Sequence, residues 1–125
     1  MTTEMTSTAT LYDRIGGADR LRALVGEIVE AHLKNQAIQS RFERFDPAQL
    51  KAGAFQFFAM AMGGPEQYTG RGLEETHRGM NISEQEFVAA TDDVFAVLQR
   101  NNVGMQEQME VLAAFFALKG QVLRL

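Results

Sequence analysis

Two histidines are the side chains in this sequence of 125 residues that most readily bind a transition metal. There is no cysteine, which excludes disulfides, zinc–thiolate sites, iron–sulfur clusters and cofactors attached through thioethers. A zinc enzyme is also disfavoured, because two histidines alone rarely make a zinc site. Metal chemistry therefore depends on His32 or His77.

His77 lies in a segment that glycines isolate from its neighbours, so the pattern predicts only a short helix over about 73–78. A helix this short is unstable without an anchor, and a bond between a metal and the imidazole would supply one. Leu73 and Met80 flank His77 and place it on an apolar surface, which suits a haem-iron ligand. The alternative is an ordinary boundary histidine without a metal.

Helical periodicity dominates the rest of the chain, and no segment alternates like a strand, so the fold class is all-α. Asp46–Pro47 is a helix start, and Ser83 to Glu86 form a capping box ahead of another helix. Helices are expected at 11–15, 18–34, from Pro47 to the Gly63–Gly64–Pro65 stop, from the capping box to about 100, and at 105–122. The last of these is expected to bury Met109, Leu112, Ala113, Phe116 and Leu118.

Composition narrows the class of protein. A net charge of −4 with no basic patch argues against nucleic acid as a partner. No apolar stretch approaches the ~20 residues that span a membrane. Residues 1–10 lack the pattern of a signal peptide and are interpreted as a flexible lead-in, with a single domain over 11–125 and the cytoplasm as the expected location. The pair Asp92–Asp93 is interpreted as part of a solvated face.

From Leu11 onward the chain resembles the group I truncated haemoglobins. The matching stretches are Leu11-Tyr-Asp-Arg-Ile-Gly-Gly17, Phe57-Phe-Ala-Met-Ala-Met-Gly-Gly-Pro65 and Tyr68-Thr-Gly70, followed seven residues later by His77. The resemblance implies a two-over-two helical sandwich, a truncated globin that holds haem b. It also implies that His77 is the proximal iron ligand and that Phe42 packs on the haem.

The distal side departs from the family pattern. Val29 stands where many members have tyrosine, Leu50 and Ala54 stand where polar groups are common, and Gly53 stands where some members have a second histidine. This set offers no hydrogen-bond donor, so we expect weak retention of dioxygen. His32 reaches the pocket only if its helix is rotated. The resemblance implies that Phe58 occupies an aromatic position that lines a ligand path in some members. Phe58, Leu73, Ala90 and Val94 are also expected to contact the haem.

These residues predict a haem protein that binds dioxygen, carbon monoxide or nitric oxide at a five-coordinate iron. The alternatives are a nitric oxide dioxygenase or weak peroxidase, and a globin-shaped interaction module without haem. The expected partners are a diatomic gas and a reductase for ferric iron, and the chain is expected to be a monomer or a homodimer. Arg44, Lys51 and Arg71 are candidate partners for the haem propionates.

Overall fold

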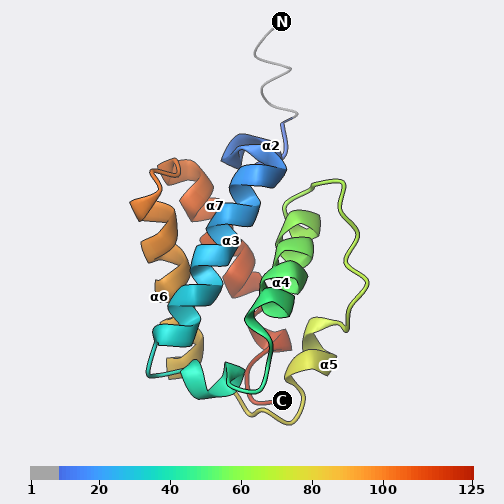
Figure 1. Cartoon of the computed structure of the whole chain (residues 1–125), viewed down its shortest axis with the longest axis vertical. Coiled ribbons are helices and arrows are strands. Elements are labelled where there is room, and N and C mark those ends of the chain that lie inside the picture. The colour runs from blue at the N-terminus through green and yellow to red at the C-terminus, as the bar shows by residue number, and fades with distance from the viewer. Residues whose placement is uncertain (1–8) are drawn as a thin grey trace, which may run out of the picture.

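The structure, a computed structural model, describes residues 9–125 (Figure 1). Its helices are α2 (Leu11–Ile15), α3 (Gly17–Lys34), α4 (Pro47–Ala61), α5 (Leu73–His77), α6 (Glu84–Arg100) and α7 (Met105–Ala117), with 3-10 turns η1 (Gln39–Phe42) and η2 (Lys119–Gln121). Across the described residues, the β-type pairing amounts to an isolated bridge between Ile82 and Leu123. The predicted all-α fold class is confirmed.

The helices begin where local side-chain hydrogen bonds favour them. Ser83 Oγ accepts from Glu86 N at 3.1 Å and Glu86 Oε1 accepts from Ser83 N at 3.0 Å, so the predicted capping box starts α6. Asp46 caps α4 ahead of Pro47 as predicted. The expected flexible lead-in falls outside the described residues except for Ala9 and Thr10. Thr10 Oγ1 accepts from Asp13 N and caps α2.

Helix α3 is the centre of the molecule. It runs between α4 on one side and α6 on the other (Figure 1). Its buried residues divide between two apolar clusters. The first joins Ile15, Leu24, Ile28, Val94, Val97, Leu98, Val103 and Val111. The second, which we call the α3–α4 cluster, joins Tyr12, Leu21, Val25, Val29, Phe55 and Ala59, with Leu50, Ala54 and Phe58 packed against it.

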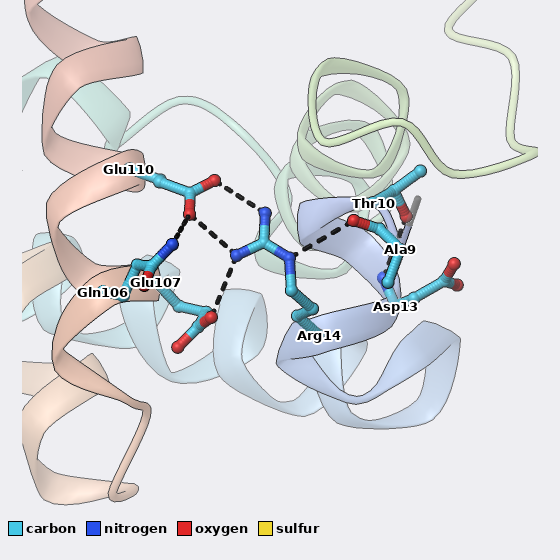
Figure 2. A network of polar contacts seen from close by, with 7 residues as sticks. All are labelled: Ala9, Thr10, Asp13, Arg14, Gln106, Glu107 and Glu110. Carbon is cyan, nitrogen blue, oxygen red and sulfur yellow. Dashed lines mark hydrogen bonds and ion pairs between the residues drawn. The ribbon is translucent and has the colours of Figure 1, made fainter. Parts of the chain in front are cut away.

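Polar contacts attach α2 to α7. Arg14 donates to both carboxylate oxygens of Glu110 at 2.7 Å and to Glu107 at 2.9 Å, and its Nε donates to Ala9 O (Figure 2). The hydrogen bonds with Arg14 hold the pKa of Glu110 below its ordinary value. This ionic cluster connects α2, the first helix of the described chain, to α7. No helix within residues 9–125 combines the length and the apolar character that crossing a bilayer requires.

The end of the chain departs from the sequence expectation. The predicted helix over 105–122 ends at Ala117, and η2 then turns the last residues toward α5. The expected burial of Met109, Ala113 and Phe116 is wrong: all three are exposed, with Met109 at 56% and Phe116 at 48%.

A neighbouring stripe of α7 faces the core instead. Val111 is buried, and so is Gln108, whose Nε2 donates to Val103 O at 2.8 Å. Leu112 and Leu118 are half-buried. The helix carries apolar residues around most of its circumference, so periodicity could not select the inward stripe. A hydrogen bond to the preceding loop made it possible to bury a glutamine there.

Candidate functional site

His77 is the last residue of α5, a helix of five residues with no buried member. Its Nδ1 lies 2.8 Å from Leu73 O. A carbonyl oxygen only accepts, so Nδ1 carries the proton in this contact. An imidazole whose single proton is on Nδ1 presents a lone pair at Nε2. This is how a histidine is oriented for a metal, with one ring nitrogen donating to the backbone and the other free to coordinate.

The predicted distal residues of α3 and α4 do come together. Val29 is 6% exposed and belongs to the α3–α4 cluster, against which Leu50, Ala54 and Phe58 pack. Phe58 also stacks on Phe115 of α7, with ring centroids 5.7 Å apart. None of these side chains offers a hydrogen-bond donor. These predicted residues therefore share one apolar cluster, and their place on the distal side of a haem stays a prediction.

The predicted residues of α6 are placed differently. Val94 is 2% exposed and belongs to the other apolar cluster, with Ile28 of α3 and Val97 of its own helix. Ala90 is half-buried one turn earlier. The structure thus does not bring Val94 into the cluster formed by the α3 and α4 residues. Its place in a haem pocket stays a prediction.

His32 is turned toward α6. Its Nδ1 lies 2.8 Å from Asp93 Oδ2, and Asn35 Nδ2 donates to the same carboxylate at 3.1 and 3.2 Å. The His32 ring stacks on Phe42, with centroids 5.6 Å apart and an interplanar angle of 11°. The expectation that Asp93 belongs to a solvated face is wrong, because its side chain is only 16% exposed and bridges two elements.

Among the basic residues, Lys51 donates to Glu30 at 2.8 Å, while Arg44 and Arg71 are exposed. Sequence analysis missed Arg41, which proves to be the best-connected of the basic residues near α5. It donates from Nε and Nη2 to the two oxygens of Glu86 at 2.7 and 2.9 Å. These bonds, together with the backbone N–H of Ser83, lower the pKa of Glu86 to about 2. The capping box marked Glu86, but no local pattern pointed to Arg41.

Residues 10–123 match the family model described as bacterial-like globin. The chain belongs to this family. A group 1 truncated hemoglobin of Mycolicibacterium paratuberculosis is 29% identical over 114 residues, covering 91% of this chain and 84% of that protein. Another from Tetrahymena pyriformis is 27% identical and covers 79% and 82% of the two chains.

Solved structures show the same fold. The truncated hemoglobin of Tetrahymena pyriformis in its Fe(III) form matches this globin with a TM-score of 0.90 at 24% identity, covering 94% of this chain and 100% of that one. The 2/2 hemoglobin of Synechococcus matches with a TM-score of 0.83 at 23% identity, covering 90% and 95%. The sequence prediction of a truncated-globin fold is confirmed.

A globin holds haem, and the donors at this site fit that group. Within the described residues no cluster of three or more histidines, cysteines or carboxylates is arranged to hold a metal ion. A porphyrin supplies four nitrogen ligands itself, so a single imidazole from the protein suffices. His77, whose Nδ1 lies 2.8 Å from Leu73 O, has the donor chemistry that this role requires.

Proposed function

We propose that this globin holds haem b through Nε2 of His77 and binds a small diatomic gas on the opposite side of the iron. The observation that carries the proposal is the 2.8 Å contact from His77 Nδ1 to Leu73 O, which orients the ring and engages Nδ1, so that Nε2 is the ring nitrogen available to a metal. When bound, haem supplies the iron position that a gas occupies. The protein supplies the axial ligand and the surface on which the macrocycle rests.

The chain offers aromatic and aliphatic side chains for that surface. Phe42 follows α3 in the η1 turn, where it already stacks on His32. An aromatic ring is well suited to pack against the flat face of a porphyrin. We assign haem contacts to His77, Phe42, Val29, Leu50, Ala54, Phe58, Leu73, Ala90 and Val94.

The preference among gas ligands follows from the lack of a hydrogen-bond donor in the predicted distal set. A dioxygen ligand carries partial negative charge, and a hydrogen bond to a charged group contributes ~1.5–3 kcal/mol. Val29, Leu50 and Ala54 offer none, and Gln56 is exposed. Carbon monoxide is less polar when bound and loses less without a donor. We therefore propose that this globin binds carbon monoxide or nitric oxide in preference to storing dioxygen, and that a reductase returns oxidised iron to the ferrous state.

The two alternatives are less well supported. Peroxidase chemistry needs a distal acid–base group, and the histidine available for that role, His32, is engaged with Asp93. Nitric oxide dioxygenation needs dioxygen to be retained, which the apolar cluster disfavours. An interaction module without haem would give a colourless protein.

Absorption spectra of the ferric, ferrous and carbonmonoxy forms test the proposal. We expect a strong Soret band for the unaltered protein, its loss or displacement in His77→Gly, and partial recovery of that variant with added imidazole. His32→Ala removes the other histidine and is the matched control, with an unchanged ferrous spectrum. A folded protein that refuses added haem contradicts the proposal, and so does a His77→Gly spectrum identical to the unaltered one.

A further inference from the structure

Helix α5 carries the proposed iron ligand, but within residues 9–125 its hydrogen bonds reach only neighbouring positions in the sequence. Among the described residues, its side-chain bonds stay local: Thr76 Oγ1 donates to Arg71 O and His77 Nδ1 to Leu73 O. No residue of the helix is buried. A five-residue helix is unstable by itself. Its position therefore depends on the contacts around it, which are those with η2 and those of the segments on either side of the helix.

The segment after α5, residues 78–83, is here called the linker. Its backbone is sharply bent, with Gly79 at φ 87° and Asn81 at φ 50°. Glycine adopts left-handed backbone freely and asparagine more readily than most residues, so the linker sequence permits both bends. Which position the bent linker takes depends on its hydrogen-bonding partners, and the structure provides one on each side.

Arg41 is the partner on the side of η1. Its Nη1 donates to Met80 O at 2.8 Å, while Nε and Nη2 donate to the carboxylate of Glu86. Glu86 in turn accepts from Ser83 N at the end of the linker. One guanidinium thus ties the middle of the linker to the first turn of α6. A planar fork makes all these contacts at once, which an ammonium group does not.

The C-terminal segment, residues 122–125, is the partner on the other side. Leu125 O accepts from Gly79 N and from Asn81 N, both at 2.9 Å. Arg124 N donates to Ile82 O at 3.0 Å, and Leu123 pairs with Ile82 in the isolated bridge. Ile82 is only 8% exposed beneath these contacts. The two bent positions of the linker therefore share one backbone acceptor from the far end of the chain.

We propose that Arg41 and the C-terminal segment are positioning residues for His77. By holding the linker from both sides they set where the imidazole stands and how tightly it binds haem iron. This inference rests on the proposed function, because it takes His77 as the iron ligand. It extends that function to residues that contact neither the haem nor the gas. Arg41 reaches the linker through its hydrogen bond to Met80 O, three residues beyond His77.

Three altered proteins test the inference: Arg41→Ala, a deletion of residues 124 and 125, and the two combined. Arg41→Lys is a milder variant that keeps the charge but loses the fork. Arg100→Ala is the matched arginine control, because Arg100 pairs with Glu27 away from the linker. Leu125→Ala is the matched control for the deletion, since it removes a side chain but keeps the carbonyl. Circular dichroism checks that each protein folds.

The readouts are the iron–histidine stretching band in resonance Raman spectra of the ferrous protein and the rate of haem transfer to an excess of acceptor apoglobin. We expect the combined variant to shift or broaden the band and to lose haem about 10- to 100-fold faster, the range typical of altered ligand support. Each single variant should show a smaller change, and both controls should match the unaltered protein. An unchanged band and haem-transfer rate in the folded combined variant would overturn the inference.

Hydrogen exchange separates this inference from the proposed function. The amides of Gly79 and Asn81 should be protected in the unaltered protein and exchange faster after the deletion. Fast exchange at both in the unaltered protein overturns the inference even if haem binds. An unaltered protein without a Soret band instead rejects the proposed function, and the exchange data then still report whether the linker is held.

Discussion

On the α3–α4 side of the proposed haem site the side chains are held by apolar packing, whereas on the α5 side they are held by directional hydrogen bonds. Val29 lies in a cluster whose members Leu21 and Val25 are 2% and 1% exposed. Helix α5 has no buried residue, and its neighbouring linker depends on Arg41 and Leu125 O. Packing resists deformation in every direction, while a few hydrogen bonds leave a helix adjustable. The shape of the proposed gas side therefore depends on packed volume, and that of the proposed iron-ligand side depends on the geometry of hydrogen bonds.

The largest expected effect on stability comes from creating a cavity in the apolar α3–α4 cluster. Leu21→Ala should lower the free energy of unfolding by about 2–5 kcal/mol, because a fully buried leucine leaves both lost contacts and a cavity. Thr76→Ala on α5 should change it by no more than about 0.5 kcal/mol. Urea denaturation of both variants measures the contrast. Equal losses would mean that α5 is packed as firmly as α3.

A donor placed on the packed side should change gas binding. Ala54→Gln brings an amide beside Val29 and Leu50, and we expect dioxygen to dissociate about tenfold more slowly, the effect of roughly 1.4 kcal/mol from one hydrogen bond. Ala54→Leu adds bulk without a donor and serves as the control. Stopped-flow measurement of dioxygen release tests this. Equal slowing by both variants would assign the effect to bulk alone.

The polar side should respond to pH through Glu86. Its pKa is lowered from 4.5 to about 2 in the folded protein, chiefly by Arg41. A lowered folded pKa gives stability that is complete above pH 4.5 and is lost as pH falls from 4.5 toward 2. Because both side chains are partly exposed, we expect a contribution on the order of 1 kcal/mol.

Glu86→Gln tests this dependence. Its urea midpoint should fall below that of the unaltered protein at pH 6, and the difference should shrink as the pH is lowered through this window. A difference that stays constant with pH would show that the Glu86 charge contributes nothing to folding.

The smallest expected effect is at an exposed pair remote from both sides. Arg100 and Glu27 have side chains that are 60% and 38% exposed. Removing Arg100 should cost no more than about 0.5 kcal/mol and should fade with added salt. Thermal unfolding at low and high salt checks this. A larger loss would show that surface ion pairs, as well as buried contacts and the linker, support this globin.

Much of the helical plan was readable from the sequence. The capping box at Ser83 and the Asp46–Pro47 start appear as predicted, and the helix predicted over 18–34 begins one residue earlier, at Gly17. The prediction was wrong for α7, where two apolar stripes compete and the structure buries the one containing Val111. Periodicity reports that a helix has an apolar face, but the choice between adjacent faces depends on what the helix packs against.

The hydrogen bonds that orient His77 and start α6 join residues within one helical turn of each other. The bond from His77 to Leu73 O spans four residues, and the contacts that start α6 span three, so the chain by itself determined them. The contacts of Arg41 with Glu86 and of His32 with Asp93 span 45 and 61 residues, and the C-terminal segment reaches the linker only after α6 and α7 have folded back. Tertiary structure decided these, because which distant groups meet depends on the packing of whole helices rather than on any nearby pattern.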